Sequence, residues 1–204
     1  DRLIEKLAPR IEKLKVGPYT AGDDVDFGPV VTSAAKQNIL NLVQSGIDQG
    51  AELVIDGRDF SLQGYEDGFF VGPHLFDRVT PDMDVYKKEI FGPVLSTVRA
   101  GSYEEAIGLA MNHEYGNGTA IFTRDGDTAR DFANRINIGM VGVNVPIPVP
   151  LAYHTFGGWK KSVFGDLNQH GPDAFKFYTR TKTVTSRWPS GIKEGGEFNF
   201  KAMD

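Results

Sequence analysis

Glu89 and Phe91 are the residues whose types and spacing most directly suggest chemistry. They stand in the stretch KKEIFGPV (87–94), where Gly92 and Pro93 mark a turn that leads into a hydrophobic run. Two basic residues and a proline-marked turn indicate a surface connection, and loops on a rigid scaffold carry much of protein function. A carboxylate and an aromatic ring held by such a turn could grip a ligand that has both hydroxyl groups and a flat ring.

Two other stretches could take part in a site, and each has an ordinary structural alternative. The segment 156–165, FGGWKKSVFG, has glycines and lysines that could hold a phosphate. It matches neither the P-loop nor the dinucleotide fingerprint, and it also fits a tight turn. The loop that begins at Pro146 is rich in proline and aromatic residues, so it fits either a cavity wall or a packing loop.

Metal and hydrolase chemistry are not expected. The four histidines lack metal-ligand spacing, and the sequence has no cysteine to join them. The acidic loop at residues 23–26 lacks the rest of a calcium-loop pattern. No serine stands in a G-x-S-x-G elbow, so a hydrolase triad has no anchor. We therefore expect no metal site, and these 204 residues contain no thiol nucleophile.

The composition narrows the range of partners. With 40% hydrophobic and 24% charged residues, the chain resembles an ordinary globular protein that can bury a sizeable core. Its net charge of −5 argues against nucleic acid and anionic membranes as partners. No apolar stretch has the length of a membrane span, and we expect no signal peptide. The lack of cysteine fits a cytoplasmic protein.

Apolar periodicity and capping residues predict an alternation of helices and strands. Helices are expected at 33–49, 102–112 and 125–136, and strands at 51–57, 94–100, 117–123 and 139–145. This pattern predicts an α/β fold with a mainly parallel sheet covered by helices. Ligands bind beyond the carboxyl ends of such strands, so the loop after residue 145 is a candidate site wall.

The two ends of the chain differ from this pattern. The chain opens without a methionine in a predicted helix whose apolar stripe starts at Leu3, so we expect a piece of a longer polypeptide. From Gly171 the alternation stops, and 175–188 is rich in threonine, valine and aromatic residues. We expect one extended strand there, which would edge the sheet or pair with another chain.

Five motifs, taken in this order, resemble the aldehyde dehydrogenase superfamily. They are EIFGPV (89–94), NHEYGNGTAIFT (112–123), GMVGVN (139–144), FGGWKKS (156–162) and FYTRTKTVT (177–185). Within that superfamily, the stretch 162–189 looks most like the methylmalonate-semialdehyde dehydrogenases. Val163 departs from the glycine that most relatives carry, which favours by analogy the branch that passes its acyl group to coenzyme A.

The resemblance implies a division of the chain. Residues 1–174 would form most of a catalytic domain whose start is missing, residues 175–189 an oligomerisation strand, and residues 190–204 a flexible tail. The strand would cross to a partner subunit in a homo-oligomer, either a dimer or a tetramer. The catalytic cysteine and the main dinucleotide-binding domain would then lie outside this chain.

The resemblance also assigns roles to particular residues. NAD would be the cofactor, with Glu89 accepting hydrogen bonds from the nicotinamide-ribose hydroxyls and Phe91 packing near the nicotinamide ring. A carboxylate can accept from two neighbouring hydroxyls, and charge-assisted hydrogen bonds of this kind are strong. The stretch that lines the aldehyde pocket in this family contains Asn144, Pro146, Ile147 and Phe156.

The implied reaction is covalent oxidation of a small semialdehyde. A cysteine thiolate would attack methylmalonate or malonate semialdehyde to form a thiohemiacetal, and a hydride would then leave for the nicotinamide. Coenzyme A would intercept the resulting thioester to give propionyl-CoA or acetyl-CoA with loss of CO₂. The chain contains no cysteine, so we expect it to be inactive alone and assign it no catalytic residue. The alternatives are another semialdehyde dehydrogenase that releases a free acid, or a truncated assembly module without catalytic activity.

Overall fold

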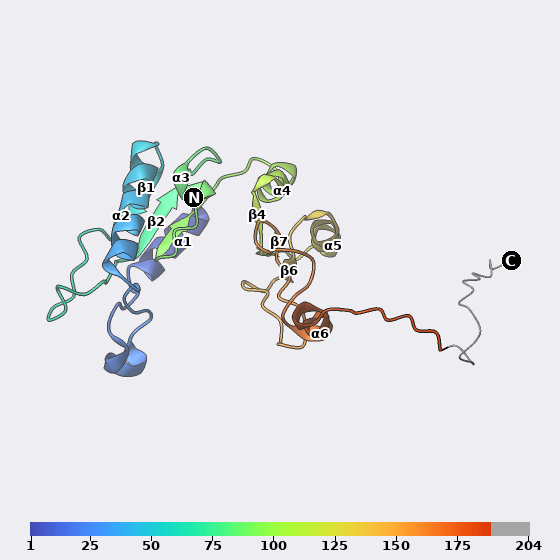
Figure 1. Cartoon of the computed structure of the whole chain (residues 1–204). Coiled ribbons are helices and arrows are strands. Elements are labelled where there is room, and N and C mark those ends of the chain that lie inside the picture. The colour runs from blue at the N-terminus through green and yellow to red at the C-terminus, as the bar shows by residue number, and fades with distance from the viewer. Residues whose placement is uncertain (189–204) are drawn as a thin grey trace.

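Figure 1 shows two neighbouring halves joined by the segment between β3 and α4. The structure is a computed structural model, and it describes residues 1–188. The first half contains α1 (Arg2–Ile11), a 3-10 helix (Tyr19–Asp24), α2 (Ser33–Asp48), β1 (Glu52–Ile55), β2 (His74–Asp77), α3 (Asp84–Lys87) and β3 (Val94–Ser96). The second contains α4 (Tyr103–Asn112), β4 (Tyr115–Gly116), β5 (Gly118–Ile121), α5 (Gly126–Arg135), β6 (Met140–Val143), β7 (Trp159–Lys160), a 3-10 helix (Gly171–Asp173) and α6 (Ala174–Tyr178).

Side-chain caps start α2, α4 and α5 where the sequence predicts these helices. The Thr32 hydroxyl accepts a hydrogen bond from the Ala35 amide at 3.0 Å, which satisfies an otherwise unpaired amide of α2. Ser102 accepts from the Glu105 amide at 3.1 Å, and the Glu105 carboxylate accepts from the Gly101 amide at 2.7 Å. The predicted helices at 33–49, 102–112 and 125–136 are therefore confirmed, with α5 capped by Asp125.

Within residues 1–188 the strands form three small sheets, one of three strands and two of two strands, and two of these sheets contain a parallel pair. β2 pairs with β3 in parallel and with β1 in antiparallel fashion. β5 and β6 form a parallel pair that α5 connects, while β4 and β7 pair in antiparallel fashion. The predicted α/β class is confirmed. No helix within residues 1–188 is long and apolar enough to cross a membrane.

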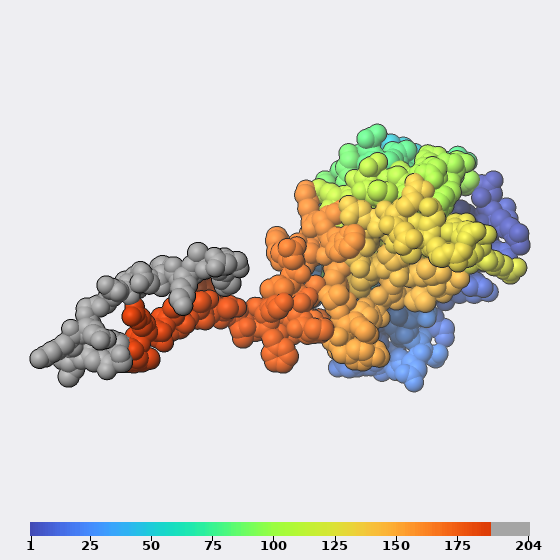
Figure 2. Space-filling model, turned by 90° about the vertical axis from the view of Figure 1, so that its right-hand side faces the viewer, coloured from blue at the N-terminus to red at the C-terminus, as the bar shows by residue number. Residues whose placement is uncertain are grey.

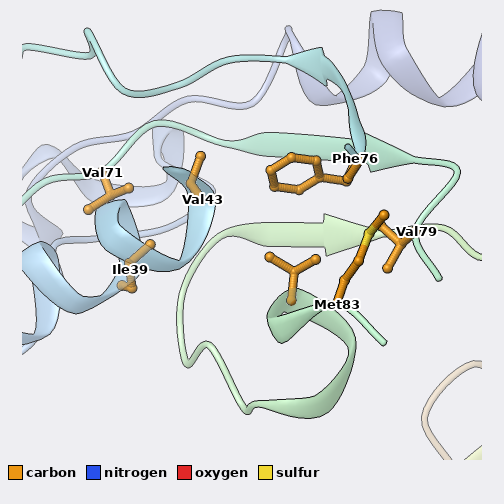
Figure 3. Close-up of a cluster of buried hydrophobic side chains, with 8 residues drawn as sticks. Ile39, Val43, Val71, Phe76, Val79 and Met83 are labelled. Carbon is orange, nitrogen blue, oxygen red and sulfur yellow. The ribbon is translucent and has the colours of Figure 1, made fainter. Parts of the chain in front are cut away.

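Each half contains an apolar cluster of its own. In the first, α2 packs against β2 and the turn after it, and Figure 3 shows Phe76 and Met83 close to Val79. Its buried members are Ile39, Val43, Ala51, Val71, Phe76, Val79, Met83 and Val85. The second cluster lies between α4, α5 and the start of β6, with Ile107, Phe132, Ile136 and Ile138 as its buried members. Burial of such side chains is the main stabilising term for each half.

The predicted strand at 175–189 is wrong at its start. Residues Ala174–Tyr178 form the short helix α6, which follows directly on the 3-10 helix Gly171–Asp173. The helical turn that starts at Gly171 therefore continues through the aromatic residues. Residues 179–188 are in no helix or strand among the described residues, and Figure 2 shows this segment projecting from the body. Its pairing with a partner subunit stays a prediction. Residues 189–204, including the predicted tail, lie outside the described residues.

A buried carboxylate, Asp77, fixes the end of β2. It accepts hydrogen bonds from the Arg99 guanidinium, with Nη2 to Oδ2 at 2.5 Å, and from the Thr97 hydroxyl at 2.9 Å. The Arg78 amide donates a further bond at 2.7 Å. The Arg99 guanidinium is the first cause that holds the pKa of Asp77 well below its usual range, so the ionised form is stabilised in the folded chain.

Replacing Asp77 with Asn is expected to lower the free energy of unfolding by about 2 kcal/mol, because hydrogen bonds to a charged group contribute roughly 1.5–3 kcal/mol each and Arg99 is partly solvated. Urea unfolding at pH 7 measures the loss. The pKa of Asp77 is lowered in the folded state. This stabilisation is therefore fully present above pH 3.8, the ordinary pKa of the group, and it is lost as the pH falls below that value.

Glu52→Gln provides the matched control. Glu52 and Arg78 form an exposed pair at 3.1 Å, so this variant should lose less than about 1 kcal/mol. Equal losses in the two variants at pH 7 would contradict the role of the Asp77 cluster.

Candidate functional site

The segment 87–94 presents Glu89 and Phe91 on its outer side. Ile90 packs against the first apolar cluster, so the residues on either side of it turn outward. Glu89 is exposed, and the Phe91 side chain is 80% exposed. Phe91 also has a φ of 56°, a left-handed backbone conformation that non-glycine residues rarely adopt.

Gly92 and Pro93 fasten this segment to the core. A Cβ atom at Gly92 would lie 2.5 Å from Cδ1 of the buried Ile39 on α2, so only glycine allows the backbone to approach this closely. The Pro93 carbonyl accepts a hydrogen bond from the His74 amide of β2 at 2.8 Å. The glycine–proline turn therefore sets the position from which both outward side chains leave the surface.

Glu89 lines a cleft of about 470 Å³, and Phe91 is not among the residues that line it. The other lining residues are Tyr86, Lys87, Lys88, His113, Tyr115, Asn117, Lys161 and Ser162. The lysines beside Glu89 are already engaged, since Lys88 pairs with Asp84 at 3.0 Å and Lys161 pairs with Glu114. Within residues 1–188, the Glu89 carboxylate has no hydrogen bond or ion pair, so its oxygens are free to accept from a ligand.

The glycine-rich stretch 156–165 supplies one wall of this cleft. The antiparallel pairing of β7 with β4 brings Lys161 and Ser162 next to Tyr115. The Ser162 hydroxyl accepts a hydrogen bond from the Gly116 amide at 3.0 Å. Sequence reasoning considered this stretch as a phosphate loop, a tight turn or a family motif with Phe156 in the aldehyde pocket, and it missed the place of Lys161 and Ser162 beside Glu89. No local signal could have found it, because the contact depends on a pairing between residues more than 40 positions apart.

Lys160 anchors that wall to the end of α4. Its ammonium group donates to the carbonyl oxygens of Met111 at 2.8 Å, His113 at 3.0 Å and Ala110 at 3.3 Å. These are carbonyls at a helix C-terminus, which lack partners within the helix and carry partial negative charge. A cation at this point therefore stabilises both the helix end and the adjacent β7.

The predicted pocket residues lie at or beyond the carboxyl end of β6, away from the Glu89 cleft. Asn144 has a φ of 58°, and its amide group bonds both the Thr123 amide at 2.9 Å and the Thr123 carbonyl at 3.0 Å. Its side chain thus extends the β5–β6 pair, and its assignment to the aldehyde pocket stays a prediction. Pro146 is exposed, and the Ile147 side chain is 73% exposed.

Phe156 lies further along the same loop. It is half-buried, and its ring centroid is 4.5 Å from that of His170. The structure places Pro146, Ile147 and Phe156 in one loop region but does not bring them into the cleft that contains Glu89. Their assignment to a substrate pocket stays a prediction.

Three features characterise this chain: parallel strands, an outward acid at a glycine–proline turn, and a glycine-rich wall beside that acid. The model of the aldehyde dehydrogenase family matches residues 1–184. The chain belongs to the aldehyde dehydrogenase family, which confirms the resemblance found in its sequence.

Comparison with individual proteins shows which members of the family this chain is similar to. A malonate-semialdehyde dehydrogenase of Pseudomonas aeruginosa is 56% identical over 204 residues, which are 100% of this chain and 41% of the relative. An acylating, mitochondrial methylmalonate-semialdehyde dehydrogenase of Arabidopsis thaliana is 50% identical over 186 residues, which are 90% of this chain and 30% of the relative.

A solved structure from Sinorhizobium meliloti, described as a methylmalonate-semialdehyde dehydrogenase complexed with NAD, is 73% identical with a TM-score of 0.86. The match covers 95% of this chain and 39% of that protein. The chain thus spans well under half the length of these three proteins.

Gly92→Ala is expected to lower the free energy of unfolding by about 1–3 kcal/mol, because the new methyl group would overpack against the buried Ile39. Ile39→Val in the same background removes the nearest atom, Cδ1, and should recover part of the loss. Urea unfolding of the single and double variants measures this coupling.

Gly108→Ala serves as the control, since nothing lies within 4 Å of the atom it adds inside α4. It should stabilise the chain, as alanine is the better helix former. Additive effects of Gly92→Ala and Ile39→Val would show that the two residues are not in contact.

Proposed function

We propose that the chain forms the C-terminal part of an NAD-dependent, coenzyme A-acylating methylmalonate- or malonate-semialdehyde dehydrogenase. The observation that carries this proposal is the free Glu89 carboxylate in its cleft, in a chain that belongs to the aldehyde dehydrogenase family. The substrate class is supported by the malonate- and methylmalonate-semialdehyde names of the relatives described above. Coenzyme A as acyl acceptor is supported by the acylating relative from Arabidopsis thaliana.

The residues of the cleft fit the ribose end of a dinucleotide. A vicinal diol needs acceptors, and Glu89 offers two carboxylate oxygens that no described side chain occupies. The neighbouring ammonium groups of Lys88 and Lys161 are held by Asp84 and Glu114, so they leave the Glu89 carboxylate to the ligand. Phe91, exposed one residue beyond the inward Ile90, would offer its ring as an apolar surface near the nicotinamide.

A bound NAD would supply the acceptor for the hydride that leaves the substrate carbon. The part of this chain in that reaction is to hold and orient the ribose, and orientation of reactants alone lowers a barrier substantially. The chain has no cysteine, so the nucleophile must be supplied by polypeptide outside these 204 residues. A cytoplasmic location stays a prediction.

Assembly into a homo-oligomer is the second part of the proposal. The segment 174–188 exposes a series of large apolar side chains, which is unusual for a surface that faces only water. Its exposed members include Phe175 at 82%, Tyr178 at 71%, Val184 at 76% and Trp188 at 89%. Burial of these side chains against a second subunit would stabilise a dimer or a tetramer.

The proposal is tested by joining the chain to the part that it lacks. The chain alone, mixed with NAD, coenzyme A and methylmalonate semialdehyde, should produce no NADH because it has no thiol. Fused behind the portion of the Sinorhizobium meliloti protein that it does not match, it should produce NADH and propionyl-CoA in equal amounts. NADH formed by the chain alone would overturn the proposal, and a free acid in place of the acyl-CoA would favour the alternative dehydrogenase.

In the same fusion, Glu89→Gln should lower kcat/KM for NAD by about 10- to 100-fold, because a charge-assisted hydrogen bond worth roughly 1.5–3 kcal/mol is weakened. The melting temperature should not change, since Glu89 is exposed and makes no bond within residues 1–188. Glu12 is an exposed acid near the start of the chain, distant in sequence from Glu89. Glu12→Gln is therefore the control, and it should alter neither kcat/KM nor the melting temperature. A lowered melting temperature with unchanged kinetics would assign Glu89 a structural role instead.

A further inference from the structure

The two walls of the Glu89 cleft come from different halves of the chain. The segment from Tyr86 to Glu89 forms one wall, and residues of β4, β7 and their neighbours form the other. Two hydrogen bonds join Tyr86 to the second half. Its hydroxyl donates to the Leu109 carbonyl at 2.9 Å, and its backbone carbonyl bonds Nε2 of His113 at 3.0 Å. The second bond lies at the cleft, because both Tyr86 and His113 line it.

His113 bridges the two walls through both nitrogens of its ring. Nδ1 lies 3.1 Å from the Tyr115 amide, which donates to it, so Nδ1 carries no hydrogen. The Tyr86 carbonyl can only accept, so the bond to Nε2 requires a hydrogen on Nε2. These two partners therefore select one neutral form of the imidazole and occupy both of its nitrogens.

The ring and the backbone of His113 are both held in place. The ring packs against Tyr86 and Tyr115, with ring centroids 5.0 Å and 5.9 Å apart, in the tilted and edge arrangements that aromatic rings favour. The His113 carbonyl accepts a hydrogen bond from the Lys160 ammonium at 3.0 Å. Lys160 belongs to β7, so the bridge is fixed to the strand pair that supplies the second wall.

The path from this bridge to the ligand site is short. Tyr86 stands three positions before Glu89 in the sequence, and the chain after Glu89 is fixed where Gly92 lies on Ile39. The wall that carries Glu89 is therefore held at two points, the glycine contact and the His113 bridge. Without the donor on Nε2, the Tyr86 carbonyl would lose its partner and this wall would be free to separate from β4.

We propose that His113 is a positioning residue, whose ring, with its hydrogen on Nε2, sets the width of the Glu89 cleft and thereby the affinity for NAD. This inference rests on the proposed function, which places the ribose of NAD in that cleft. His113 acts through the position of Glu89 and makes no bond to the cofactor, since both of its nitrogens are occupied. Loss of the bridge should therefore weaken NAD binding more than it lowers kcat.

The chain alone tests the bridge itself. Its histidines are labelled with ¹⁵N, and the ring signals of His113 are assigned at mildly alkaline pH as those missing from the His113→Gln variant. We expect a hydrogen on Nε2 and none on Nδ1, because the Tyr115 amide and the Tyr86 carbonyl require this form. A hydrogen on Nδ1 would overturn the inference, since neither bond of the bridge could then form.

Two replacements separate the hydrogen bond from the packing of the ring. His113→Phe keeps an aromatic ring but has no donor, whereas His113→Gln keeps a side-chain N–H donor without the ring. In the fusion described above, NAD affinity is measured by fluorescence titration without aldehyde or coenzyme A. His113→Phe should raise the Kd for NAD about tenfold, and His113→Gln should change it by less than about threefold. In both variants kcat should change by less than about threefold.

His154→Phe is the matched control. His154 is exposed and is not among the residues that line the Glu89 cleft, so the same replacement there should leave the Kd for NAD unchanged. Circular dichroism checks that the variants fold. If His113→Phe does not fold, the ring signals and His113→Gln still decide, because a tenfold weaker NAD affinity of His113→Gln would contradict the role of the donor.

The outcomes separate this inference from the proposed function. Equal NAD affinity in His113→Phe and the unchanged fusion, or equal weakening in the Phe and Gln variants, would overturn the role of His113. If only His113→Phe weakens NAD binding but the unchanged fusion makes no acyl-CoA, the role of His113 stands and the proposed function fails. If the fusion makes NADH and propionyl-CoA with the same NAD affinity in every variant, the proposed function stands and the role of His113 fails. A fusion that binds no NAD would overturn both.

Discussion

The close contact between Gly92 and Ile39 is the constraint on which the candidate site depends. Ile39 is held in the apolar core by α2, and the absence of a side chain at Gly92 lets the loop backbone lie directly on it. With that point fixed, and with Ile90 turned inward, Glu89 must leave on the outer side. The site therefore takes its geometry from the hydrophobic core and not from bonds within the loop.

Left-handed backbone conformations distinguish structural residues from a functional candidate. Asn144, Lys160 and Phe91 all have positive φ, which costs free energy in any residue with a side chain. The side chain of Asn144 bonds the Thr123 backbone, and that of Lys160 bonds three helix carbonyls, so packing and hydrogen bonds offset the cost. Phe91 has neither, as its ring is 80% exposed. A strained residue that displays an apolar ring to solvent is more readily explained by a ligand or partner than by the stability of the fold.

Sequence patterns predicted the features that depend on neighbouring residues. Thr32 and Ser102 identified their helices because capping is local, and the apolar runs within 117–123 and 139–145 identified the two strands of the β5–β6 pair. The wall formed by Lys161 and Ser162 could not be predicted, since it depends on the long-range pairing of β4 and β7. The strand expected from residue 175 was wrong at its start, where the structure has a short helix. Periodicity alone cannot assign a run of four or five residues to a strand or a helix.

The Glu89 cleft shares a wall with a neighbouring groove of about 720 Å³, which Ala106 and Leu109 of α4 help to line. Tyr86, His113, Tyr115 and Asn117 line both of them, so these side chains form a shared wall. His113 holds that wall together, because one ring nitrogen bonds the Tyr86 carbonyl at 3.0 Å and the other accepts from the Tyr115 amide at 3.1 Å. Because close-packed side chains do not move separately, a change in the groove would alter the shape of the cleft that contains Glu89.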